Sequence, residues 1–328
     1  MTVALIETPV TPAPEVESKT ERQMPWQDLV SPGLLMAGAV EAKDGITSQQ
    51  MLQAADLDWD VAVRPLWRRM ADGSFKQHTK QREVFRTDTE DELGVCKTRY
   101  EVFSNREAFA FGDALVSEGT GKWTVAGQQN GGARVFMVME LGEGFDVLGG
   151  DSYQSYLFLR TSHGDGTSIS AMVLPFRLQC TNQTALARRE AMSSWSIPHT
   201  TTVSARLEEA RNALKLTMNY EAEFQKLAEQ LAAIKVSDEQ AKALINSIVP
   251  QRRARRDDVI ADILANYQTS PTAEEFRGTG YGLLNGVTEY YDHVKTQRNG
   301  NARFESIMFG EGRIVRDGLT ANLLSLAA

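Results

Sequence analysis

An Asn130-Gly131 pair lies within the segment from Lys122 to Leu141, and it constrains the fold more than any other feature of the chain. Apolar and polar residues alternate on both sides of the pair, as they do in strands that bury one face. The pair therefore predicts a hairpin of two antiparallel strands. Two further apolar segments, residues 153–162 and 168–179, predict a second hairpin around the turn at 163–167. We expect an antiparallel meander of about four or five strands, with Pro175 at an edge or a bulge.

The segments before this meander predict short helices and strands. Thr47 is placed to cap a helix that begins at residue 48, and Ser104 or Asn105 is placed to cap a second helix. Residues 56–67 alternate as a half-buried strand does, and Pro65 makes that strand an edge strand or ends it. Residues 94–102 predict another strand.

A long helix is predicted after the meander, from about Thr202 to Lys235. Its apolar residues recur at spacings of three and four, and they are Val203, Leu207, Ala210, Leu214, Phe224, Leu227 and Leu231. Further helical segments are predicted at about 238–267 and from 280 onward. Because the apolar faces of the sheet and the helix must cover each other, we predict an α+β fold. In it, a curved antiparallel sheet packs against the long helix, with additional C-terminal helices.

Three regions follow from these assignments. Residues 1–24 are rich in Thr, Pro, Glu and Ala without periodicity and predict a disordered tail. Residues 25–235 predict the α+β core domain, and residues 236–328 predict a mainly helical C-terminal region. The first ten residues lack the basic and apolar regions of a signal peptide, and no window has the apolar length of a membrane span. The two cysteines, Cys96 and Cys180, are far apart in apolar surroundings, so we expect a cytoplasmic protein without disulfides.

A polar block after the second hairpin is the first candidate binding site. It combines basic side chains with an aromatic one, as sites for single-stranded nucleic acid do, and its members are Arg177, Asn182, Arg188, Arg189, Trp195 and His199. A second basic run consists of Arg252, Arg253, Arg255 and Arg256. Two structural interpretations stay open: Trp195 as a core anchor, and Asp257 and Asp258 as salt partners of the run. The net charge of −8 argues against a surface that coats nucleic acid, but it permits a local basic groove.

Two further basic clusters occur in the first third of the chain. Arg64, Arg68 and Arg69 lie near Trp67, and Lys76, Lys80, Arg82 and Arg86 follow them. Taken one at a time, such residues are typical of a solvated face.

Four sequence blocks carry a resemblance to a known family. They occur in one order across roughly residues 50 to 325, and they are residues 98–111, 156–200, 285–293 and 302–310. In these blocks the chain resembles the phage/plasmid-like protein family, a domain of unknown function. The order of helix, hairpin, strands and long helix is also similar to that of single-strand annealing recombinases. That resemblance implies a single-stranded DNA partner, a homo-oligomeric ring or filament, and strand annealing without nucleotide hydrolysis or cofactor.

Two other classes of function stay open. Glu289 and His293 are four residues apart on a predicted helix, with Asp292 beside them, and they could bind a metal for a nuclease-like reaction. His163 and Asp165 in the hairpin turn could add to such a site. The chain has no GxxxxGKS/T, HExxH or GxSxG motif, so no common catalytic signature supports an enzyme. The third class is an oligomeric scaffold or host-interaction protein without nucleic-acid contact.

Overall fold

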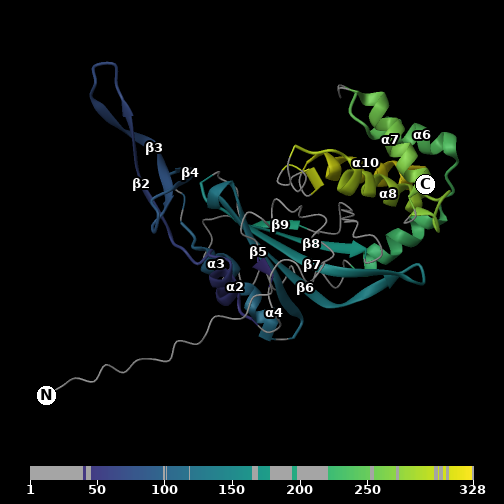
Figure 1. Cartoon of the computed structure of the whole chain (residues 1–328), viewed down its shortest axis with the longest axis horizontal. Coiled ribbons are helices and arrows are strands. Elements are labelled where there is room, and N and C mark those ends of the chain that lie inside the picture. The colour runs from purple at the N-terminus through teal and green to yellow at the C-terminus, as the bar shows by residue number, and fades with distance from the viewer. Residues whose placement is uncertain are drawn as a thin grey trace.

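Figure 1 shows the computed structural model of the chain, in which two antiparallel sheets precede a group of helices. The structure describes residues 40–41, 46–98, 100, 102–117, 119–164, 169–177, 194–197, 221–251, 255–270, 273–298, 302, 306–307 and 310–326. The predicted α+β class, with a curled antiparallel sheet and several C-terminal helices, is confirmed.

The larger sheet has the strand order β1-β5-β6-β7-β8-β9, and each neighbouring pair is antiparallel. Its long strands are β5 (Gly121–Gln129), β6 (Arg134–Val147), β7 (Asp151–Ser162) and β8 (Ile169–Arg177). The short strands β1 (Val40–Glu41) and β9 (Ser194–Ile197) extend it at its two ends. Asn130 and Gly131 have φ angles of 52° and 65° in the turn after β5, so the hairpin predicted from this pair is confirmed.

Pro175 lies in β8 opposite Ser155 of β7. The pairing of β8 with β9 covers only residues 169–172, so Pro175 lies beyond the stretch that β9 covers. A proline cannot donate a backbone hydrogen bond to a neighbouring strand, which explains why it is tolerated at this position.

Short helices pack beside the larger sheet. They are α2 (Ser48–Ala54), α3 (Asn105–Phe109) and α4 (Asp113–Ser117), with a 3-10 turn, η1 (Ala110–Gly112), before α4. Thr47 caps α2 as the sequence predicted, and of the two residues proposed for the second cap Ser104 is the one that caps α3; each forms a capping box. The Asp113 carboxylate accepts hydrogen bonds from Ser48 of α2 and from Trp123 Nε1 of β5, at 2.6–2.9 Å. One side chain thereby ties two helices to the sheet.

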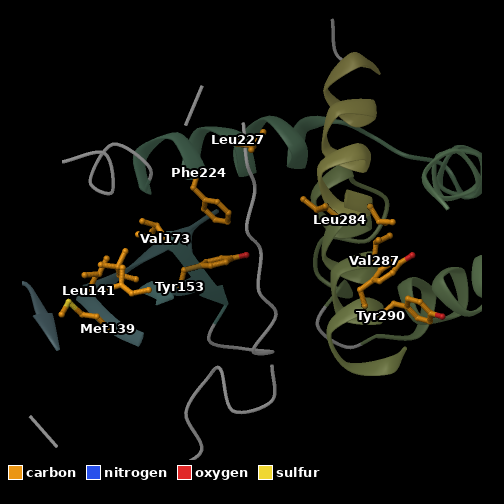
Figure 2. Close-up of a cluster of buried hydrophobic side chains, with 14 of the residues drawn as sticks. Met139, Leu141, Tyr153, Val173, Phe224, Leu227, Leu284, Val287 and Tyr290 are labelled. Atoms are coloured by element: carbon orange, nitrogen blue, oxygen red, sulfur yellow. The ribbon is translucent and has the colours of Figure 1, made fainter. Parts of the chain in front are cut away.

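Residues 221–233 are helical and pack on the sheet. The Phe224 ring lies edge-on to Tyr153 of β7 with centroids 5.0 Å apart, and Leu227 and Leu231 are buried. The C-terminal half of the predicted long helix therefore packs on the sheet as expected, whereas residues 202–220 lie outside the described residues. Figure 2 shows Phe224 beside Tyr153, with side chains of α8 on the other side of the same core cluster.

The C-terminal region is helical, with α6 (Asp238–Ile248), α7 (Arg256–Thr269), α8 (Gly280–Glu289), a π-helical turn η4 (Tyr290–Val294) and α10 (Glu311–Leu326). The helical segment expected at about 238–267 forms two helices, because Pro250 lacks the N–H that would continue α6. Buried hydrogen bonds join this region to the sheet. The Tyr281 hydroxyl donates to the Asp151 carboxylate at 2.6 Å, and the Tyr153 hydroxyl lies 2.6 Å from the Tyr281 hydroxyl, which is then the acceptor. Burial raises the pKa of Tyr281, so the hydroxyl stays protonated and available as a donor.

Gly282 of α8 lies so close to residues 276–277 that a methyl group does not fit. A Cβ atom there would be 2.1 Å from the Phe276 carbonyl oxygen. We expect Gly282→Ala to lower the free energy of unfolding by about 1–3 kcal/mol, the usual cost of overpacking. Urea unfolding measures this value.

Gly318→Ala in α10 is the matched control. Its Cβ would lie 3.7 Å from Ile248, which is ordinary contact, so helix propensity alone should leave the variant as stable as the parent or more so. Equal loss of stability in the two variants would contradict the packing argument.

A candidate nucleic-acid interface

The smaller sheet has the order β2-β3-β4, with β2 (Val61–Arg69), β3 (Phe75–Arg86) and β4 (Glu92–Lys97). β4 pairs with β3 only over Gln81–Phe85, so beyond these residues β2 and β3 pair with each other alone. We call residues 66–81 the arm. Figure 1 shows it extending away from the larger sheet and from the C-terminal helices. No residue of the arm is buried, so its two strands have no core of their own.

β2 is an edge strand that continues through Pro65, as the sequence allowed. Pro65 pairs with Arg82 and Trp67 pairs with Gln77, so Leu66 faces four residues of β3. Such an irregularity bends and twists a ribbon. It separates the arm from the root of the hairpin, where β4 joins the sheet.

A tight turn closes the tip of the arm. Met70 N donates to Ser74 O at 2.8 Å, and Gly73 has a φ of 83°, a conformation that favours glycine. The Asp72 carboxylate accepts from the backbone N–H and the hydroxyl of Ser74, at 2.9 and 2.6 Å. These bonds lower the pKa of Asp72. The one acidic side chain of the arm is thus part of its turn.

The arm is strongly basic in an acidic chain. Arg68, Arg69, Lys76 and Lys80 against Asp72 give residues 66–81 a net charge of +3, whereas the whole chain carries −8. All four basic side chains belong to exposed residues, and Arg68 pairs directly with Lys76 across the ribbon. Like charges opposite each other destabilise a strand pair, so this arrangement favours a bound anion.

Two aromatic side chains are also exposed on the arm. Trp67 is 58% exposed and Phe75 is 67% exposed, high values for rings of this size. The register pairs Trp67 with Gln77 and Arg69 with Phe75. Directly paired residues and residues two apart share a face of a ribbon, so Trp67, Arg69 and Phe75 lie on one face.

The basic residues at the root of the hairpin have structural roles instead. Arg64 binds Glu83 through two nitrogens at 3.0 and 2.7 Å and lies over the Phe85 ring. Arg82 donates to the carbonyls of residues 98 and 100, and Arg86 binds Asp88. The structure therefore divides the members of these two sequence clusters differently. Arg64, Arg82 and Arg86 at the root hold the small sheet together, and the four members on the arm project into solvent.

The root is packed against the larger sheet. A Cβ atom on Gly164, just after β7, would lie 2.9 Å from Gly94 Cα of β4, so the two backbones are in direct contact. His163 is fully buried beside this contact and bonds Asn105 Oδ1 at 2.9 Å. This histidine has a structural position, while Asp165 lies outside the described residues.

The polar block predicted after the second hairpin is only partly described. Arg177 ends β8, and Trp195 in β9 pairs with the buried Ala171. Six residues of strand separate Ala171 from Arg177, about 20 Å at the usual rise, so these two backbone positions are not adjacent. Asn182, Arg188, Arg189 and His199 lie outside the described residues, and their part in a site stays a prediction.

Two members of the second basic run have partners within the C-terminal helices. Arg255 binds Asp258 at 2.7 Å, the salt partner that the sequence suggested. Arg256 donates to the carbonyls of Asn246 and Val249 at the end of α6. Arg252 and Arg253 lie outside the described residues.

The residues proposed for a metal have structural partners. Glu289 accepts from Ser270 Oγ at 2.6 Å, and Asp292 forms a fully buried ion pair with Arg316 at 2.9 Å. His293 lies in the π-helical turn rather than in a continuous α-helix with Glu289. Within the described ranges, no group of three His, Cys, Asp or Glu side chains could hold a metal ion.

The arm was not predicted as a unit, because no strand was expected at residues 75–86. The available signal was the Asp72-Gly73 pair, a turn dipeptide between two basic segments that each contain an aromatic residue.

Comparison with known proteins gives a family but no activity. Residues 92–308 match the model of DUF932, a domain of unknown function. The chain belongs to the DUF932 family. No curated protein and no solved structure matches it. The DUF932 match includes β4 and the four long strands of the larger sheet, but it begins after the arm. In the part of this DUF932 protein that the structure describes, no helix has the length and apolar character needed to span a bilayer.

Proposed function

We propose that this protein binds single-stranded DNA and anneals complementary strands, without nucleotide hydrolysis or a cofactor, and that the arm is its principal DNA contact. The observation that carries the proposal is the concentration of exposed positive charge and exposed aromatic surface on one projecting ribbon. Single strands are bound by these two features together, because cations neutralise phosphates and aromatic rings stack on bases.

The acidic remainder of the chain supports a local contact rather than a coating of the whole surface. With a net charge of −8, most of the molecule repels phosphate, so DNA is directed toward the arm. A homo-oligomer would present several arms side by side. Strands held on neighbouring arms would meet at a high effective concentration, which is sufficient to accelerate pairing.

Binding is tested with Arg68→Ala combined with Lys76→Ala. We expect the affinity for labelled single-stranded DNA to fall on the order of tenfold at moderate salt, because two phosphate contacts are lost. The dependence of log K on log salt concentration should become shallower by about 1.4, at 0.7 per contact on a single strand. Fluorescence anisotropy over a salt series measures both quantities.

Lys226→Ala is the matched control, since Lys226 is an exposed cation outside the arm, 66% exposed and paired with Glu223. It should bind DNA as the parent does. Equal binding by the arm variant and the parent would remove the arm from the site. If Arg188→Ala with Arg189→Ala weakened binding instead, the polar block would be the principal contact.

A further inference from the structure

The two faces of the arm differ in chemistry, and the difference suggests how it selects a ligand. We infer that Trp67 and Phe75 form a stacking platform for unpaired bases, which makes the arm bind single strands in preference to duplex, with little dependence on base sequence. This inference rests on the proposed function and deepens it by assigning selectivity to two side chains.

The strand register places the two rings as diagonal neighbours. Trp67 pairs with Gln77 and Phe75 pairs with Arg69, so the rings are offset by one step along the same face. Diagonal neighbours in an antiparallel pair are about 7–8 Å apart. Stacked bases are about 3.4 Å apart, so this separation accommodates one base between the two rings. Arg69 lies on the same face and is positioned for the phosphate beside that base.

The basic residues of the opposite face cannot provide this selectivity. Arg68 and Lys76 pair directly with each other across the ribbon. Each offers a ligand a positive charge at the end of a flexible chain and no aromatic ring. Both single strands and duplexes offer phosphates, so these two cations attract either form. Bases in a duplex are stacked within the helix and unavailable to the rings, whereas every unpaired base offers a ring face. Selectivity for single strands therefore depends on the aromatic pair.

The same geometry gives a reason for product release. When two bound strands pair, their bases leave the aromatic platform for the stack of the duplex. The charges alone then hold the product, and they hold it more weakly than the platform and charges together held the single strand. Annealing would thus remove the contacts that retained its substrate.

The test compares two double variants on three ligands: a thymidine oligonucleotide, an abasic oligonucleotide of the same length, and a duplex. We expect Trp67→Ala with Phe75→Ala to weaken thymidine binding by about tenfold or more, from the loss of base stacking. Binding of the abasic strand and of the duplex should be unchanged. Arg68→Ala with Lys76→Ala should weaken all three. Phe75→Trp should retain the preference for the thymidine strand.

Ile314→Ala serves as the control, because Ile314 is 67% exposed on α10 and lies outside the arm. If the aromatic variant kept full thymidine affinity while the basic variant lost it, DNA binding would stand and stacking would be wrong. If the aromatic variant lost all three ligands equally, general disruption of the arm would replace stacking as the explanation. If the intact protein bound no nucleic acid, the proposed function itself would fail. If, in addition, the aromatic variant no longer self-associated, the arm would be a contact between proteins.

Discussion

Excision of the arm is expected to abolish single-stranded DNA binding and annealing while leaving the rest of the fold intact. Pro65 and Arg82 pair across the hairpin, so an Asn-Gly turn can join them in place of residues 66–81. The excision removes all four projecting cations and both exposed rings at once. We expect affinity to fall at least on the order of 100-fold at moderate salt. Anisotropy with labelled DNA, and pairing of complementary strands in the presence of chelator, measure the two losses.

The stability of the shortened protein provides the control for this experiment. None of residues 66–81 is buried. The excision removes only the Gln81 pair between β3 and β4, and the pairs of residues 82–85 remain. The thermal midpoint should therefore stay close to that of the parent. A shortened protein that folds and still anneals would show that the arm is dispensable, and the polar block would then be the site to test.

Arg316→Met is expected to cause the largest loss of stability among the substitutions considered. Arg316 and Asp292 are both 0% exposed, and Arg316 Nη1 lies 2.9 Å from the Asp292 carboxylate. Arg316 also donates to the Ile307 carbonyl. Removing the guanidinium leaves a buried carboxylate without its countercharge, which costs about 3–5 kcal/mol. Urea unfolding with several probes measures the change.

Two further variants distinguish the stability lost to an uncompensated buried charge from the stability lost to altered packing. Adding Asp292→Asn to Arg316→Met removes the uncompensated charge, so part of the stability should return. Arg313→Ala breaks the more exposed pair with Asp317, at 3.6 Å, and should cost no more than about 1 kcal/mol. If Arg316→Met were as stable as the parent, the ion pair would not hold these helices.

The local elements were predictable because their signals lie within a few residues of one another. The side chains of Thr47 and Ser104 cap helices by accepting from backbone N–H groups three residues further on. Asn130-Gly131 forms a turn because both residues adopt positive φ angles. The strands of the larger sheet were predictable because they bury apolar side chains. Residues 135–139 of β6 are all buried, so the middle of this strand is covered on both faces, and its continuous apolar run is the pattern of such a strand.

The strand β3 was not predictable by the same means. Its sequence, FKQHTKQREVFR, contains few apolar residues, and only Val84 among them is buried. Hydrophobic periodicity reports burial, so a strand that projects into solvent produces no such pattern. Without β3, the basic residues around Trp67 could not be recognised as one surface. The division between Arg64, which binds Glu83, and Arg68, which projects, depends on the same missing partner strand.

The opposite case is the group of Glu289, Asp292 and His293. Their spacing suggested a metal site, whereas in the structure Glu289 binds Ser270 and Asp292 binds Arg316. Proximity along the chain placed the three together. The partner of Asp292 is Arg316, 24 residues away, and no short-range pattern identifies it.

The sequence by itself determined the α+β class, the antiparallel hairpins and the helix starts, because each depends on local backbone preference or on the burial pattern of its own residues. Only the tertiary structure decided which charged residues bind one another and which project into solvent. Ion pairs and strand partners join residues that are far apart in the chain. Arg82 is held by carbonyls 16 and 18 residues away, while Arg68, Arg69, Lys76 and Lys80 extend beyond β4 on a ribbon without a core. That separation in space gives the protein its candidate nucleic-acid interface.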